Sequence, residues 1–173
     1  MNVFVLPGFL NRRECEETIA LFPSPAPATV NGPNVALRKC EASFLAADTD
    51  QKRVLIAKVH GTSRQVNRNY FHFDLVGGEP LQLASYGVGD YYGQHLDIGP
   101  GISGRRKLSM IVQLTDPAEY DGGSVEMWGS GEVDREQGAL IVFPSYLVHE
   151  VHPITRGVRK ALVAWMIGSG PYR

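Results

Sequence analysis

The second half of the chain is a series of short apolar or alternating runs separated by glycine, proline and aspartate. From Tyr70 onward these runs read YFHFDLV, LQLASY, KLSMIVQL, GSVEMW, GALIVF, YLVHEV and VRKALVAWMI. Runs of this length and composition, bounded by turn residues, are typical of β-strands. The sequence therefore predicts an antiparallel sandwich or small barrel, and 19 Gly and 11 Pro in 173 residues favour such a turn-rich fold.

The first part of the chain has the pattern of helices that support a sheet. Asn11 stands three residues before Glu14, the spacing of a capping box that opens a helix. We expect a strand at 3–6, a helix from this box through Phe22, a surface loop at 23–33, a strand at 35–45 and an amphipathic helix from Asp50 toward Asn69. The predicted class is mainly β with supporting helices.

Size, charge and cysteine content narrow the class of protein. A chain of 173 residues has the length of one domain, which we divide into helical support at about 1–69 and a β-core at about 70–167. A net charge of -1 gives no overall attraction for nucleic acid or anionic membrane. With no signal peptide or membrane span, a cytoplasmic protein is expected, and Cys15 and Cys40 are expected to be reduced structural thiols.

The segment SYGVGDYYGQHLDIGPG carries two residues that could share one metal ion. His95 and Asp97 are two positions apart, so on a strand their side chains project from the same face. His149, in PSYLVHEVHP, could supply a third ligand. Two histidines and one carboxylate form a face of ligands that leaves positions on iron open for chemistry.

Arg159 lies ten residues beyond His149 and places a cation beside this predicted metal site. Pro153 and Gly157 between them would turn the chain so that two neighbouring strands bring the residues together. An arginine fork suits bidentate recognition of a carboxylate, which makes a dicarboxylate co-substrate plausible. Tyr86 lies nine residues before His95, on the predicted strand that precedes it. Its hydroxyl could donate a hydrogen bond to the same carboxylate, or the residue could serve only in packing.

The order and spacing of three segments resemble the 2-oxoglutarate-dependent oxygenases of the prolyl 4-hydroxylase-like superfamily, especially the bacterial PKHD-type hydroxylases. The segments are YGVGDYYGQHLD, KLSMIVQLTDPAEYDGGSVEMW and GALIVFPSYLVHEVHPITRGVRKALVAW, and the resemblance covers roughly residues 81–165. It implies a double-stranded β-helix, the jelly roll of cupin-like proteins, with Fe(II) held by His95, Asp97 and His149. It also implies that Arg159 and Tyr86 hold the distal carboxylate of 2-oxoglutarate, and that ascorbate serves as a reductant.

The resemblance further implies the reaction. O2 and 2-oxoglutarate would be consumed, succinate and CO2 released, and a C–H bond hydroxylated in a prolyl residue, free proline or a related amino-acid-like compound, whether small molecule, peptide or protein. Trp165 is similar to a tryptophan near the metal in oxygen-sensing prolyl hydroxylases, or it is a packing residue. Gln113 stands where those enzymes have a tyrosine, and collagen-type enzymes commonly have lysine where this chain has Arg159. These departures leave the substrate open, with Gln113, Trp165 and Arg106 as candidate pocket residues.

Two other functions remain open from the sequence. Arg105, Arg106 and Lys107 could contact phosphates, which would suit a nucleic-acid demethylase of the same superfamily, although nucleic acid is not the favoured partner. The architecture also hosts non-catalytic metal-binding β-barrel modules. The loop at 98–106 could close over an acidic or peptide substrate or could be a mobile surface loop.

The other histidines do not match a ligand pattern. His60 precedes Gly61 at an expected helix interruption, His72 lies in an expected early strand, and His152 precedes a proline at a strand end. We predict structural or solvent-exposed roles for these three.

Overall fold

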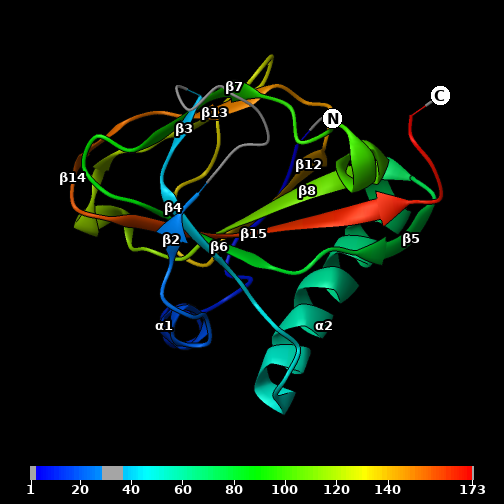
Figure 1. Cartoon of the computed structure of the whole chain (residues 1–173), viewed down its shortest axis with the longest axis horizontal. Coiled ribbons are helices and arrows are strands. Elements are labelled where there is room, and N and C mark those ends of the chain that lie inside the picture. The colour runs from blue at the N-terminus through cyan, green and yellow to red at the C-terminus, as the bar shows by residue number, and fades with distance from the viewer. Residues whose placement is uncertain (1–2, 29–36, 173) are drawn as a thin grey trace.

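The apolar runs of the sequence form two facing antiparallel sheets in the computed structural model, which describes residues 3–28 and 37–172. The larger sheet has the strand order β1-β12-β8-β15-β6-β4-β2, with β5 also paired to β15, and the smaller has the order β11-β10-β13-β7-β3. Figure 1 shows α1 and α2 on one side of the larger sheet and β3, β7 and β13 on the other. The predicted class, mainly β with supporting helices, is confirmed.

The larger sheet contains β1 (Phe4–Leu6), β2 (Ala26–Pro27), β4 (Glu41–Phe44), β5 (Leu75–Gly78), β6 (Gln82–Tyr86), β8 (Arg106–Gln113), β12 (Leu140–Pro144) and β15 (Arg159–Gly168). The smaller contains β3 (Arg38–Lys39), β7 (Tyr91–His95), β10 (Val125–Met127), β11 (Gly131–Glu132) and β13 (His149–Val151). A separate pair joins β9 (Asp121–Gly122) to β14 (Ile154–Arg156). The helices are α1 (Arg12–Ala20) and α2 (Asp50–Val66), with a π-helical turn at Asn67–Phe71 and 3-10 turns at Gly101–Arg105 and Pro117–Glu119.

Strand alternation divides the interior into two apolar cores. On β15, Leu162, Ala164 and Met166 belong to the core that the helices cover, whereas Ala161 belongs to the core between the sheets. Successive side chains of a strand point to opposite faces, so Arg159, Ala161, Val163 and Trp165 face the space between the sheets. That face lines the candidate site described below.

The two helices begin where local capping chemistry places them. The Asn11 side chain accepts a hydrogen bond from the Glu14 backbone N–H at 3.0 Å, and the Glu14 carboxylate accepts one from the Asn11 N–H at 2.8 Å. The predicted capping box is therefore present, although α1 ends at Ala20 and not at Phe22. α2 begins after Thr49, whose hydroxyl accepts from the backbone of Lys52, and it continues unbroken through Gly61, where an interruption was expected.

Three further details of the predicted secondary structure differ from the observed one. The strand expected at 35–45 is two strands, β3 and β4, which join different sheets, and residues 35–36 lie outside the described part. The loop expected at 23–33 contains β2, and residues 29–33 are not described. His72 is not in a strand: it follows the π-helical turn with φ of +59°, in the left-handed region. In the described ranges, no helix is both long and apolar enough to cross a membrane.

His60 of α2 packs against β5 of the larger sheet. It is buried, and a Cβ added to Gly78 of β5 would collide with its imidazole. Burial lowers the pKa of His60, and the nearby positive charge of Arg64 lowers it further, while a hydrogen bond with the backbone of Glu79 acts in the opposite direction. The folded protein therefore holds this imidazole in its neutral form.

This environment predicts a specific loss of stability in acid. The unfolded chain takes up a proton at His60 at a pH near 6.5, and the folded chain does so only at lower pH. The stability that depends on neutral His60 is thus complete above that pH and falls as the pH drops below it. Urea unfolding between pH 8 and pH 5 should show the wild type losing more free energy of unfolding than His60→Leu. Parallel pH dependences of the two proteins would contradict this account.

Candidate active site

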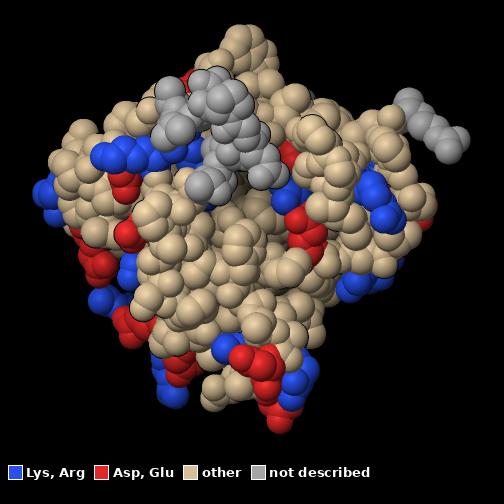
Figure 2. Space-filling view, in the orientation of Figure 1, with Lys and Arg blue, Asp and Glu red and all other residues tan. Residues whose placement is uncertain are grey.

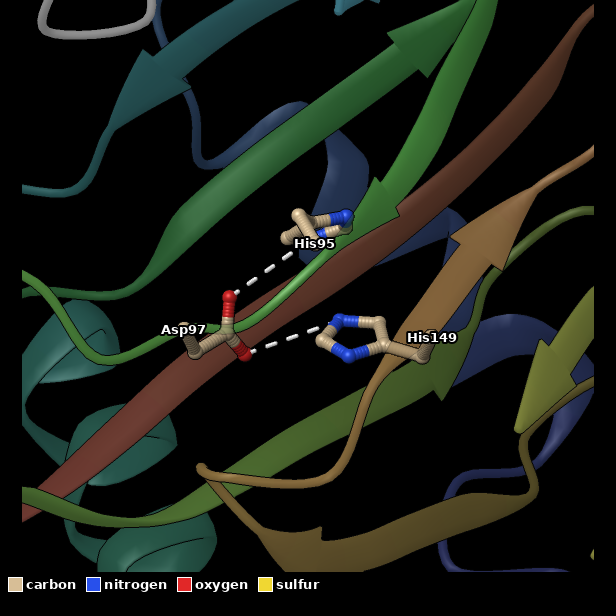
Figure 3. Close-up of side chains that lie close together, drawn as sticks. All are labelled: His95, Asp97 and His149. Carbon is tan, nitrogen blue, oxygen red and sulfur yellow. Dashed lines mark ion pairs between the residues drawn. The ribbon is translucent and has the colours of Figure 1, made fainter. Parts of the chain in front are cut away.

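Three potential metal ligands converge between the sheets, at the ends of β7 and β13 (Figure 3). His95 closes β7 and lies directly opposite His149, the first residue of β13. Asp97 follows two residues after His95, and its Oδ1 and Oδ2 lie 3.7 Å from His95 Nε2 and 3.7 Å from His149 Nε2. The side chains are 6%, 9% and 5% exposed for His95, Asp97 and His149. The sequence prediction of one shared site is thus geometrically sound, although Asp97 lies just beyond the strand.

The backbone orients both imidazoles for metal binding. His95 Nδ1 lies 2.8 Å from the carbonyl oxygen of Gly93, and His149 Nδ1 lies 2.9 Å from that of Leu147. If Nδ1 carries the proton and donates it to the carbonyl, each Nε2 is left with a free lone pair directed toward Asp97. Two imidazole nitrogens and a carboxylate on one side of a site are the donor set that suits Fe(II) and leaves positions open.

The same surroundings set the charges of the ligands. Burial, with the neighbouring His149, lowers the pKa of His95 to about 4, against the opposing effect of Asp97. For Asp97, burial alone would raise the pKa, but His149 and His95, together with Ser109, outweigh it and the pKa lies below its usual value. A neutral His95 and an ionised Asp97 are the forms that bind a metal cation.

Asp97 is also held in place through its backbone. Its N–H donates to the carbonyl of Ser145 at 3.0 Å, and its own carbonyl accepts from Arg106 Nη1 at 3.1 Å. Arg106 is in turn paired with both carboxylate oxygens of Glu79, at 2.6 and 2.7 Å, and lies 3.9 Å from the ring centroid of Trp165. The Trp165 indole nitrogen makes no hydrogen bond of good geometry to a described residue, yet it is close enough to Asp97 to lower the pKa of its carboxyl.

Arg159 lies at the inner end of the same pocket and is 2% exposed. Its Nη2 donates to Gln113 Oε1 at 2.8 Å, and Gln113 Nε2 donates to the carbonyl of Asp134 at 2.9 Å. Its Nε has no partner, and in the described ranges no carboxylate lies within 4.0 Å of the guanidinium. A buried cation without a counter-charge is costly, so a ligand that brings a carboxylate would stabilise this arrangement.

The path of the chain to Arg159 differs from the predicted one. His149 and Arg159 do not lie on neighbouring strands: β13 belongs to the smaller sheet and β15 to the larger, so the two side chains face each other across the sandwich. Gly157 permits the turn before β15, because it has φ of +73° and a Cβ there would collide with the backbone carbonyl of Glu119. The sequence spacing correctly predicted that His149 and Arg159 lie near one another, but it did not predict that they belong to different sheets.

Tyr86 is the direct cross-strand partner of Arg159. The Arg159 guanidinium carbon lies 5.6 Å from the Tyr86 ring centroid, and the tyrosine is buried. Burial raises the pKa of Tyr86 well above its ordinary value, so the phenol remains protonated and can donate a hydrogen bond. The candidate pocket residues Trp165 and Arg106 line the cavity, whereas Gln113 acts behind it through Arg159.

The cations that suggested phosphate contact are engaged within the protein. Arg105 Nε donates to the carbonyl of Gly168 at 3.0 Å, Arg106 is paired with Glu79, and Lys107 is buried with its ammonium 3.8 Å from the Tyr172 ring centroid. On the face in Figure 2, the basic and acidic side chains of the described residues are interspersed. The loop at 98–106 contains a 3-10 turn, and part of it lines the pocket mouth.

The cavity between the sheets has a volume of about 490 Å³. It is lined by the three metal-ligand candidates, by Arg159 and Tyr86, and by two residues that the sequence analysis did not identify, Arg38 and Gln82. Gln82 could have been found from its strand, because it is four residues before Tyr86 and faces the same side. No comparable pattern marks Arg38, which reaches the pocket from the two-residue strand β3.

Three side chains at the surface, one exposed and two partly exposed, form one other cluster of potential ligands among the described residues. His152 Nε2 lies 3.0 Å from Glu126 Oε2, and Glu150 is the cross-strand neighbour of Glu126. His60 and His72 are in neither cluster. His60 has the structural role that was predicted for it, and His72 is exposed.

Comparison with known proteins agrees with this geometry. Residues 81–167 match the family model described as the 2OG-Fe(II) oxygenase superfamily. A PKHD-type hydroxylase of Synechococcus sp. (strain CC9902) is 40% identical over 82 residues, which cover 46% of this chain and 37% of that protein. Another, of Thermosynechococcus vestitus, is 34% identical over 109 residues, covering 59% of this chain and 48% of that protein. The matches thus span less than half the length of these relatives.

Solved structures share the fold over nearly the whole chain. A Pseudomonas putida prolyl-4-hydroxylase superposes with a TM-score of 0.75 at 22% identity, covering 98% of this chain and 94% of that one. A viral collagen prolyl hydroxylase from Paramecium Bursaria Chlorella virus-1 gives 0.75 at 19% identity, covering 97% of both chains. This likeness confirms the predicted double-stranded β-helix.

The geometry of the three ligands predicts the outcome of removing the carboxylate. Asp97→Ala should weaken binding of Mn(II), a redox-inert probe of the site, by more than the roughly 10- to 100-fold that loss of a supporting hydrogen bond costs a metal site. Anaerobic calorimetric titration of Mn(II) measures this. His152→Gln, in the exposed cluster, is the control and should leave the affinity unchanged. If Asp97→Ala binds Mn(II) with the affinity of the wild type, Asp97 is not a ligand of this site. A loss of Mn(II) affinity in His152→Gln would place the metal in the surface cluster instead.

Proposed function

Because the chain belongs to the 2OG-Fe(II) oxygenase superfamily, we propose that it hydroxylates a C–H bond with Fe(II) as cofactor and 2-oxoglutarate as co-substrate. One observation carries the proposal: Arg159, which is buried and has no carboxylate partner among the described residues, lies in the same cavity as His95, Asp97 and His149. A metal site alone would suit many functions. A metal site with an unpaired guanidinium in the same cavity suits a ligand that can chelate at one end and present a carboxylate at the other.

His95, Asp97 and His149 would hold the iron, and Arg159 with Tyr86 would bind the distal carboxylate of 2-oxoglutarate. Bound Fe(II) would couple the reduction of O2 and the decarboxylation of 2-oxoglutarate to oxidation of a C–H bond. Arg159 offers charged donors in a fixed plane, and its Nη2 is oriented by Gln113. Tyr86 adds a neutral donor, since its phenol stays protonated.

The protein contributes positioning and exclusion of water. Ala161, Val163 and Trp165 alternate along β15 beside Arg159, so the floor of the cavity between the cation and the metal ligands is largely apolar. Fixed charges act more strongly on a ligand in such surroundings than they do in water. The co-substrate would therefore be held rigidly beside the metal.

We propose succinate and CO2 as co-products, and as substrate a prolyl residue, free proline or a related amino-acid-like compound. The support for the substrate class comes from the names of related proteins, which include prolyl hydroxylases of the same fold. Ascorbate would act as a reductant, and O2 as the second co-substrate.

We further propose that residues 1–173 form a single dioxygenase domain. β1 pairs with β12, β3 with β7, and β4 with β6, so short strands from the first 44 residues complete both sheets. The helical part and the β-core therefore share their hydrogen bonds and would fold together.

A nucleic-acid demethylase is less well supported, because Arg105, Arg106 and Lys107 are occupied by contacts within the protein. A non-catalytic metal-binding module would have no use for a buried guanidinium without a counter-charge. Turnover separates the module from the enzyme.

Succinate formation tests the proposed function. With Fe(II), O2 and ascorbate, the wild type should convert 2-oxoglutarate to succinate, and removal of iron by a chelator should abolish the conversion. Arg159→Met should raise the KM for 2-oxoglutarate roughly 10- to 100-fold, since hydrogen bonds to a charged group contribute about 1.5–3 kcal/mol each. Quantification of succinate by mass spectrometry measures both effects.

The matched control is Lys160→Met, which removes a cation from the next position of β15, where the side chain faces away from the cavity. Its KM should equal that of the wild type. An unchanged KM in a folded Arg159→Met protein would refute the role of Arg159, and absence of succinate from iron-loaded wild type would refute the proposed activity.

A further inference from the structure

The described residues that line the cavity carry more positive than negative charge. Among the described residues that line it, three are arginines, Arg38, Arg106 and Arg159, and one is acidic, Asp97. Asp97 is committed to the metal site. The three guanidinium groups therefore require partners from elsewhere, and they differ in whether they have one.

Arg106 has its own counter-charge. Two of its nitrogens bind the two oxygens of Glu79, at 2.6 and 2.7 Å, in the bidentate geometry that neutralises a guanidinium most fully. A third nitrogen binds the carbonyl of Asp97. Arg106 is thus part of the wall of the site, with little capacity left for a ligand.

Arg159 is assigned to 2-oxoglutarate by the proposed function, and this assignment accounts for one carboxylate and one cation. The co-substrate would also bring a keto acid end, which the metal neutralises. Arg106 and Arg159 are thus each assigned a carboxylate partner, whereas Arg38 has none among the described residues.

Among the described residues, Arg38 forms hydrogen bonds only with neutral groups. Its Nε donates to Cys40 Sγ at 3.0 Å and its Nη2 to Gln82 Oε1 at 3.1 Å. In the part of the chain that the structure describes, no carboxylate lies within 4.0 Å of its guanidinium, whereas the adjacent Lys39 is paired with Asp90 at 3.3 Å. The preceding residues 29–36, TVNGPNVA, contain no aspartate or glutamate that could serve as a counter-charge.

The position of Arg38 is close to the metal ligands. Its guanidinium carbon lies 4.8 Å from the ring centroid of Tyr92, and that ring stacks on His95 with the centroids 3.4 Å apart. Arg38 is therefore linked to the candidate metal ligand His95 through a single aromatic ring, that of Tyr92. Arg38 and Arg159 approach the cavity from different sheets, β3 and β15. Against the larger effect of burial, both are near enough to Tyr86 to lower the pKa of its phenol, so the experiment below must separate the ligand of Arg38 from that of Arg159.

We propose that Arg38 binds a carboxylate of the compound that is hydroxylated. The substrate would then be a free amino acid or the C-terminal residue of a peptide, whose own carboxylate pairs with Arg38 while a neighbouring C–H bond faces the metal. An internal residue of a protein has no such carboxylate. Three exposed apolar side chains that line the cavity, Phe44, Leu96 and Ile102, suit the uncharged part of such a substrate.

The proposal rests on the proposed function, so the experiment first tests co-substrate binding alone. 2-Oxoglutarate is titrated anaerobically into Mn(II)-loaded wild type, Arg38→Gln and Arg159→Met. Wild type and Arg38→Gln should bind it equally, and Arg159→Met more weakly. If the wild type does not bind it, the proposed function fails and this inference with it. If Arg38→Gln binds as weakly as Arg159→Met, Arg38 belongs to the co-substrate site and the inference alone is overturned.

The second step compares acids with their amides. L-proline and the other L-amino acids, free and N-acetylated, are tested against the matching carboxamides for stimulation of succinate release. In the wild type at least one acid should have a KM roughly tenfold or more below that of its amide, the difference expected for one charge-assisted contact. Arg38→Gln should abolish the preference and Arg38→Lys should retain part of it.

The matched control is Lys39→Gln, which makes the same charge change at the next residue of β3, where the side chain is 62% exposed. It should keep the preference of the wild type. Equal KM values for acids and amides, stimulation by no acid in the panel, or the same loss of preference in Lys39→Gln would each overturn the assignment of Arg38.

Discussion

The alternation of side chains along β15 is the constraint on which the site depends. Leu162, Ala164 and Met166 bind the larger sheet to its helices, and the intervening positions, beginning with Arg159, face the space between the sheets. A shift of one residue in register would exchange the two sets, burying the guanidinium under the helices and moving apolar residues into the cavity. The apolar core therefore fixes the cation at the inner end of the site.

The smaller sheet supplies the opposite wall of the site. His95 and His149 are cross-strand partners, and the carbonyl oxygen two residues before each, of Gly93 and Leu147, orients its ring. Asp97 completes the group from just beyond β7, where hydrogen bonds to Ser145 and Arg106 fix its backbone. Metal ligands and buried cation thus come from different sheets, and the packing of the sandwich sets the space between them.

Much of this arrangement follows from the sequence, because it depends on local pattern. The spacing of His95 and Asp97 predicted their convergence, the spacing of Asn11 and Glu14 predicted a capping box, and the alternating runs predicted antiparallel strands. The structure has all three, although Asp97 lies beyond the strand on which it was expected. Contacts between residues that are far apart in the sequence were harder to predict. No local signal shows that Glu79 neutralises Arg106, or that β13 and β15 belong to different sheets.

Arg38 was missed for the same reason. It is one of two residues in β3, a strand too short to have a periodic pattern, and its importance appears only when the charges of all the residues around the cavity are compared. The structure also gives Gln113 a role: its amide oxygen accepts a hydrogen bond from Arg159, so it would act on the proposed co-substrate site only through that arginine.

The central claim is that a metal site and a carboxylate site share one cavity. Anaerobic calorimetric titration of 2-oxoglutarate into the protein, with and without Mn(II), tests it most directly. The account predicts tight binding of one equivalent that requires the metal, because chelation and the contact with Arg159 must act on the same molecule. Binding of the same strength without metal, or no binding to folded, metal-loaded protein, would contradict it.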